Sequence, residues 1–211
     1  MAKRSEAAGG GTRTAGGQPA LRTARLVLRP FRASDAADVE RLAGAREVAD
    51  TTLHIPHPYP PGAAERWIGA QAAAWAAGSG ATFAVCRADD GALVGAIGLA
   101  IAPEHARAEL GYWIGVPHWN RGYATEAGRA MLALAFDTLG LHRVQAHYML
   151  RNAASGRVMR KLGMRPEGVR RGAFRKGDAF EDVEEYAILA HDDRRERTDA
   201  TDATDATGAA G

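Results

Sequence analysis

The segment that restricts the possible folds most is the junction at residues 120–125, where a glycine-containing loop leads from an apolar stretch into a long helical pattern. It reads Asn-Arg-Gly-Tyr-Ala-Thr. The small residues at 122 and 124 let a ligand approach the main chain closely. The unpaired N–H groups of a first helical turn, with the positive end of the helix dipole, favour an anion such as a phosphate. An ordinary turn into a helix has the same local pattern, so the flanking segments must decide between the two.

Apolar periodicity around this junction predicts a mixed α/β domain. We expect strands at 24–30, 82–87, 93–100, 108–114, 143–149, 164–171 and 180–189, and helices at 34–42, 63–77, 123–139 and 152–162. Four prolines lie between residues 56 and 61. Because proline interrupts helices, the whole of 46–62 is predicted to be a loop. The pattern sums to about seven strands and about four helices.

The two ends of the chain differ in composition from its middle. Residues 1–20 are mostly Ala, Gly, Arg and Thr, and residues 193–211 contain a repeated Thr-Asp-Ala. Such segments bury too little apolar surface to fold, so both are predicted to be disordered tails. Residues 21–192 have the size of one domain. A hydrophobic content of 46% supplies enough apolar residues for its core.

Several functional classes are disfavoured by composition. The single cysteine, Cys86, excludes an internal disulfide, and its apolar neighbours predict a buried core residue. We expect a cytoplasmic protein without a membrane partner, because no apolar run approaches about 20 residues and no signal-peptide pattern is present. A formal net charge of +2 does not argue for nucleic-acid binding. The seven histidines lack ligand spacing, so no metal is expected.

The motifs that follow the junction give it a specific interpretation. Residues 121–127 read Arg-Gly-Tyr-Ala-Thr-Glu-Ala, and are followed by Asn-Ala-Ala-Ser at 152–155 and Lys-Leu-Gly-Met at 161–164. This order and spacing resemble the GNAT N-acetyltransferase superfamily, and within it the RimJ/RimL-like branch. The resemblance covers nearly all of residues 24–190 and implies a mostly antiparallel sheet splayed at its central strands. The chain departs from the general pattern at Trp119, where the superfamily usually has Gln or Arg.

The resemblance implies that acetyl-coenzyme A is the co-substrate and lies in the gap between the splayed strands. Backbone N–H groups of residues 121–125 would hold its pyrophosphate, and its pantetheine arm would pair with the backbone near 114–116. One N–H near Val116 would polarise the thioester carbonyl. The implied coenzyme-binding set is Ile114, Gly115, Val116, Arg121, Gly122, Tyr123, Ala124, Thr125, Asn152, Ser155 and Arg157.

Two side chains are the catalytic candidates that the resemblance implies. Glu109 would take the proton of the attacking amine, or it could serve as a salt-bridge partner or substrate clamp. Ser155 would donate to the departing thiolate, or it could satisfy a backbone group at a helix start. His54, His57 and Tyr112 are the candidate acceptor-binding residues, although both histidines also fit a loop surface. Strand alternation places Tyr112 on the opposite face from Glu109.

The expected activity is acetyl transfer to a primary amine by direct attack in a ternary complex. An N-terminal amine of a protein or peptide is the first candidate acceptor. A small-molecule amine (an aminoglycoside, a polyamine or an amino acid) and a non-catalytic acyl-coenzyme A sensor are the alternatives. Residues 46–62 and the hairpin at 172–180 are predicted to select the acceptor.

A basic run favours further partners without choosing among them. Residues 151–176 hold nine Lys or Arg and one acid, Glu167. They could form a solvated face, reach the coenzyme phosphates through residues such as Arg157, or dock a ribosomal partner, with no direct nucleic-acid binding expected otherwise. Both a monomer and a homodimer are compatible with the sequence.

Overall fold

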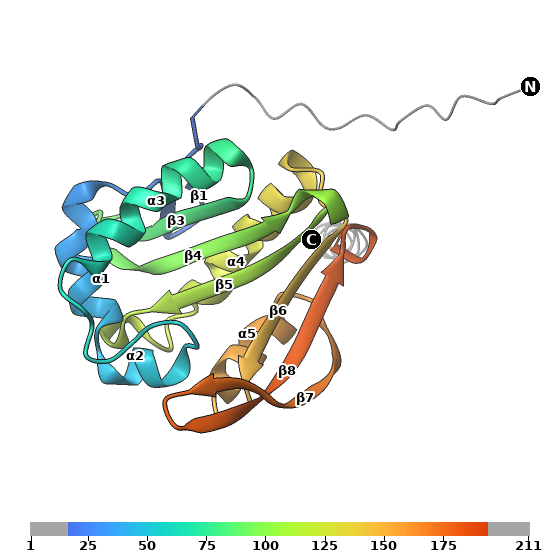
Figure 1. Ribbon diagram of the computed structural model, residues 1–211. Coiled ribbons are helices and arrows are strands. Elements are labelled where there is room, and N and C mark those ends of the chain that lie inside the picture. Colours follow the sequence, from blue (N-terminus) through green and yellow to red (C-terminus); the bar gives the residue numbers. More distant parts are fainter. Residues whose placement is uncertain (1–16, 194–211) are drawn as a thin grey trace, which may run out of the picture.

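A single eight-stranded sheet organises the computed structural model, which describes residues 17–193 (Figure 1). The strand order is β1-β2-β3-β4-β5-β6-β8-β7. Its strands are β1 (Leu21–Arg22), β2 (Leu26–Arg29), β3 (Gly80–Arg87), β4 (Leu93–Ala102), β5 (Arg107–Ile114), β6 (Arg143–Met149), β7 (Arg165–Lys176) and β8 (Ala179–Leu189). Neighbours are antiparallel except β5 and β6, which run parallel. The prediction of a mixed, mostly antiparallel sheet is confirmed.

Helices cover both faces of this sheet. They are α1 (Ala36–Ala43), α2 (Arg46–Thr51), α3 (Ala63–Ala77), α4 (Tyr123–Ala133) and α5 (Ala153–Lys161), and α4 continues as a π-helical turn over Leu134–Thr138. Short 3-10 turns span Ala33–Asp35, Pro103–His105 and Val116–His118. In Figure 1, α1 and α3 lie on the near face of the sheet, while α4 and α5 lie behind it. Within residues 17–193, none of the helices combines the length and apolarity that crossing a membrane requires.

The alternation of β3 explains why its sequence is almost continuously apolar. Phe83 and Val85 point into the larger core, which includes residues of α4 and α5. Ala84 and Cys86 point the other way, into the cluster formed with α1 and α3. A strand covered on both faces needs apolar residues at successive positions. Cys86 is only 2% exposed, in agreement with its prediction as a core residue.

Two elements were not expected from the sequence. The prediction of a loop over 46–62 is wrong for its first six residues, which form α2 with Val48 and Ala49 buried. Proline begins only at 56, so nothing prevents a short helix before it. The added strand β1 pairs antiparallel with β2 and is two residues long, too short to show a period of two.

The predicted tails, 1–20 and 193–211, lie outside the described residues except for 17–20 and 193. In the described part of the first tail, Gln18 Nε2 donates to the backbone carbonyl of Thr82 at 2.8 Å. The start of the described chain is thereby attached to β3.

Candidate active site

The site begins where the two parallel strands separate. β5 and β6 pair at only three positions, from Arg107 with Arg143 to Glu109 with Gln145. Beyond Glu109 the strands diverge, and this divergence is visible in Figure 1. A cleft of about 860 Å³ opens there, within the range of small-molecule and cofactor sites. The splayed strands thus expose main chain and side chains to a ligand.

One wall of the cleft is the junction that precedes α4. Gly122 is the N-cap of α4 and has φ 77°, a left-handed conformation that favours glycine. Arg121, Gly122, Tyr123, Ala124 and Thr125 all line the cleft, as the sequence predicts for a phosphate-binding turn. The first-turn N–H groups have no partners within the helix, so they are available to an anion.

Glu126 fixes the orientation of this helix start, and the sequence analysis did not single it out. Its carboxylate accepts hydrogen bonds from Thr23 Oγ1 at 2.6 Å and from the backbone N–H of Arg25 at 2.8 Å, and it pairs with the Arg25 guanidinium. Burial raises the pKa of Glu126, but these hydrogen bonds outweigh burial and lower the pKa below its ordinary value. The first turn of α4 is therefore joined to the segment between β1 and β2.

Trp119, the departure from the superfamily pattern, has a structural contact of its own. Its indole N–H donates to the carbonyl of Ile114 at 2.6 Å, and the N–H of Gly115 donates to Val94 at 2.9 Å. Two of the backbone groups expected to pair with pantetheine are thus engaged within the protein. Of residues 114–116, only Ile114 lines the cleft. Val116 opens a 3-10 turn, and its N–H, the group expected to polarise the thioester carbonyl, belongs to a residue that does not line the cleft.

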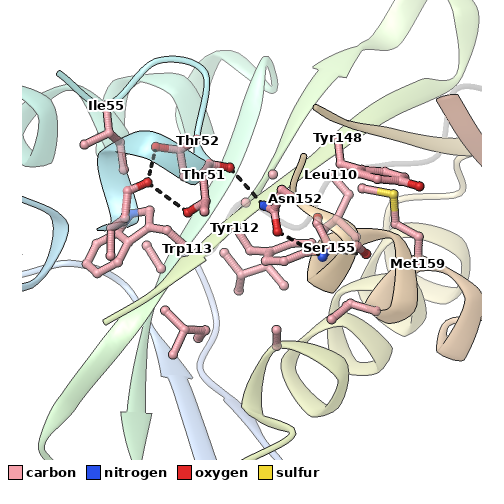
Figure 2. Close-up of a pocket in the computed structure, with 18 of the residues that line it drawn as sticks. Thr51, Thr52, Ile55, Leu110, Tyr112, Trp113, Tyr148, Asn152, Ser155 and Met159 are labelled. Atoms are coloured by element: carbon pink, nitrogen blue, oxygen red, sulfur yellow. Dashed lines mark hydrogen bonds between the residues drawn. The ribbon is translucent and has the colours of Figure 1, made fainter. Parts of the chain in front are cut away.

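Ser155 lies in the cleft with a tyrosine hydroxyl against it. Tyr112 Oη is 2.7 Å from Ser155 Oγ and also donates to the Ser155 carbonyl at 3.3 Å. Figure 2 shows the two side chains converging from β5 and α5. Burial raises the pKa of Tyr112 to about 12, so this phenol keeps its proton at physiological pH. The structure therefore places Tyr112 beside Ser155, away from the Glu109 face of β5.

Both the oxygen and the nitrogen of the Asn152 side-chain amide make hydrogen bonds within the protein. Its Oδ1 accepts from the N–H of Ser155 at 3.3 Å and so caps α5, while its Nδ2 donates to the carbonyl of Thr51 at 2.9 Å. Figure 2 shows both bonds, of which the one to Thr51 joins α5 to the end of α2. The expected hydrogen bond from Asn152 to pantetheine would compete with internal partners. Arg157 lies farther along α5 and also lines the cleft.

Glu109 occupies the point of divergence, and His147 is its neighbour from β6. Glu109 Oε1 is 3.4 Å from His147 Nδ1, and Glu109 Oε2 accepts from Gln145 Nε2 at 3.5 Å. The Glu109 side chain is 43% exposed, so the carboxylate remains accessible from the cleft. The His147 ring stacks on Phe174 of β7, with centroids 5.0 Å apart. The sequence analysis missed His147, because alternation shows its face of β6 but not which strand lies beside it.

Another wall of the cleft is formed by residues 51–55, at the end of α2 and just after it. Thr51, Thr52, Leu53, His54 and Ile55 all line the cleft. Lys176, near the tip of the β7–β8 hairpin, donates to the carbonyls of Leu53 and Ile55. Burial lowers the pKa of Lys176. His57 was predicted to bind the acceptor, but it does not line the cleft. Its ring is exposed, with Nδ1 3.0 Å from the carbonyl oxygen of Gly44.

The charges around the cleft are mostly basic or neutral. Among the described residues that line it, Glu109 is the only acid, whereas Arg121, Arg157 and Lys161 are basic. The basic residues come from the α4 junction and from α5, and Glu109 comes from β5. Within residues 17–193, no three His, Cys, Asp or Glu side chains gather as they would around a metal ion.

A family model described as "Acetyltransferase (GNAT) domain" matches residues 25–165. The chain belongs to the GNAT acetyltransferase family. It is therefore an acyltransferase, and enzymes of this family use acetyl-coenzyme A. The match spans the cleft from β2 to the start of β7, including the α4 junction and Glu109.

Relatives of this acetyltransferase match it over most of their length. The chain is 32% identical over 181 residues to an uncharacterised N-acetyltransferase, YoaA of Bacillus subtilis (strain 168), covering 81% of this chain and 97% of the relative. A GNAT-family acetyltransferase structure from Bacillus anthracis matches with a TM-score of 0.74 and 26% identity, over 82% of this chain and 99% of that one. The structure of Mycobacterium smegmatis RimJ in complex with CoA-disulfide matches with a TM-score of 0.71 and 25% identity, over 79% and 82%.

Proposed function

We propose that this acetyltransferase acetylates the N-terminal amine of a protein or peptide. The coenzyme supplies the acetyl group as a thioester. The N–H groups at the start of α4 hold its pyrophosphate, with Arg121 and Arg157 adding charge, since all of these residues line the cleft. The size of the cleft and the left-handed Gly122 support this assignment.

Glu109 takes the proton of the attacking amine in this proposal. A carboxylate on the acceptor side, half exposed and held by His147 and Gln145, has the position that a general base needs. On the other side of β5, Ser155 donates to the departing sulfur. Because Tyr112 keeps its proton, its hydroxyl can donate to Ser155 Oγ while Ser155 donates onward. Tyr112 thus acts as a positioning residue for Ser155.

The observation that carries the choice of acceptor is the single carboxylate among the described cleft-lining residues. A polyamine or an aminoglycoside carries several positive charges, and its recognition calls for several acidic groups. An N-terminal amine carries one charge, and its ordinary pKa of roughly 7.7–8.0 leaves part of it neutral at physiological pH. Apolar residues that also line the cleft, such as Ile55 and Trp113, suit the first side chains of a peptide.

The test is acetyl-coenzyme A turnover, followed as thiol release, with peptides that differ in their N-terminal residue and with spermidine and kanamycin. We expect turnover with peptides and little with the polycations. The matched control is each peptide with its N-terminus formylated and an internal lysine retained, which should be inactive. Faster turnover with spermidine or kanamycin than with any peptide would show that the acceptor is a small polycationic amine and not a peptide N-terminus. Coenzyme binding without turnover on any acceptor would point to a sensor instead.

A further inference from the structure

Residues 51–55, here called the acceptor wall, are fixed by three hydrogen bonds to main-chain carbonyls. Asn152 Nδ2 donates to the Thr51 carbonyl at 2.9 Å from the coenzyme side. From the opposite side, Lys176 Nζ donates to the Leu53 carbonyl at 3.3 Å and to the Ile55 carbonyl at 2.7 Å. The wall begins at the last residue of a helix of only six residues and precedes a proline-rich turn, so it has little regular structure of its own to hold it.

Lys176 is unusual in what its ammonium binds. It lies near the tip of the β7–β8 hairpin, and within residues 17–193 it makes none of the ion pairs that most nearby arginines make. Its ammonium donates instead to two carbonyls two residues apart, which a single charged group with three donors can satisfy at once. Lys176 itself does not line the cleft, whereas both residues whose carbonyls it holds do.

We propose that Lys176 is a positioning residue that determines acceptor binding by clamping the acceptor wall to the β7–β8 hairpin. This inference rests on the proposed function for the identity of the acceptor, but not for the clamp itself. The Lys176 ammonium hydrogen-bonds to Leu53 and Ile55, and neither to the α4 turn nor to Asn152. The clamp therefore affects acceptor affinity and leaves coenzyme affinity unchanged. The hairpin, a separate part of the chain, thereby sets the shape of the pocket.

The decisive comparison is Lys176→Met against Arg171→Met, an exposed position on the same strand. Loss of two charge-assisted hydrogen bonds predicts a rise in the acceptor KM of roughly tenfold or more, with kcat and coenzyme Kd changed by less than about twofold. Arg171→Met should leave all three unchanged. Lys176→Arg keeps the donors and should restore most of the acceptor affinity, which a purely structural role of the lysine stem would not require.

Amide hydrogen exchange at residues 52–55 tests the clamp without any acceptor. We expect faster exchange there in Lys176→Met, and unchanged exchange in α4 and α5. Lys176→Gln replaces the methionine variant if the latter does not fold. Unchanged exchange at the wall, or a loss confined to kcat or to coenzyme affinity, would overturn the proposal. If no acceptor is turned over by the unmodified protein, the proposed function fails, while the exchange comparison still decides whether Lys176 holds the wall.

Discussion

Glu109→Gln keeps the shape of a single side chain and removes its basic carboxylate. If Glu109 is the base, kcat/KM for a peptide should fall by about 100-fold at pH 7, the lower end for general base catalysis, because part of the acceptor is already neutral. The difference in kcat/KM between the variant and the unmodified protein should become smaller as the pH rises through roughly 8, where the amine itself loses its proton. Initial rates across pH 6.5–9.5 measure this.

The matched control for that variant is Glu104→Gln, an exposed carboxylate in the 3-10 turn before β5. It should behave like the unmodified protein. A loss of activity in Glu109→Gln that stays constant across the pH range would assign Glu109 to acceptor clamping. In that case the proton would have to leave the amine by another route.

The turn that begins α4 depends on one left-handed glycine, and a pair of variants separates its conformational role from its ligand role. Gly122 (φ 77°) borders the cleft, and Gly140 (φ 64°) has no heavy atom within 4 Å of an added Cβ. Alanine at either position costs about 1–2 kcal/mol of stability, because a side chain is strained at positive φ. Only Gly122→Ala should also weaken coenzyme A binding, since under the proposed function the phosphates approach the main chain at this turn and an added Cβ would stand in their way.

Urea unfolding and calorimetric titration with coenzyme A measure both quantities for this pair. Equal losses of stability with a weaker coenzyme Kd in Gly122→Ala alone are the expected result. If both variants bind coenzyme A as tightly as the unmodified protein does, the backbone at 122 does not contact the phosphates.

The stability of the whole molecule should depend on one buried ion pair beside β2. Arg29 Nη1 and Nη2 donate to Asp35 at 2.7 and 2.8 Å, and the N–H of Arg32 adds a bond at 2.7 Å. Burial raises the pKa of Asp35, but these bonds outweigh it and the net pKa is lowered. A depressed folded pKa stabilises the protein above the unfolded value of about 3.9. This stability is lost as the pH falls through the folded pKa.

Asp35→Asn should therefore lower the free energy of unfolding by about 3 kcal/mol at pH 7, because it leaves Arg29 largely buried without its charge partner. In the unmodified protein, protonation of Asp35 lowers the free energy of unfolding below about pH 4. This contribution should be absent from Asp35→Asn. The control, Asp38→Asn, breaks an exposed pair with Arg41 and should cost less than about 1 kcal/mol. Denaturant unfolding at several pH values checks both, and equal costs in the two variants would contradict the assignment.

Much of the fold could be predicted because periodicity is a local property of the chain. The predicted strand at 143–149 and helix at 63–77 agree with β6 and α3. The short elements β1 and α2 could not be predicted, because two and six residues do not establish a period and their stability comes from what they pack against.

The candidate site also contains a part that the sequence predicts and a part that it does not. The α4 junction was predictable because its glycine, small residues and helix start are contiguous in the chain. Glu126 joined to Thr23, and Lys176 joined to Leu53, are contacts across more than 100 residues, and no local pattern signals them. Tyr112 could be placed on the face opposite Glu109, but its bond to Ser155 required the position of α5.

The sequence by itself determined the longer elements, the family and the glycine turn that begins α4, because hydrophobic period, glycine conformation and helix capping act over a few residues. Only the tertiary structure decided which groups surround the acceptor. The parallel pairing of β5 with β6 brings His147 to Glu109, and the fold of the β7–β8 hairpin brings Lys176 to the acceptor wall. Those neighbours are chosen by the packing of the whole sheet and its helices, which is a property that no single segment contains.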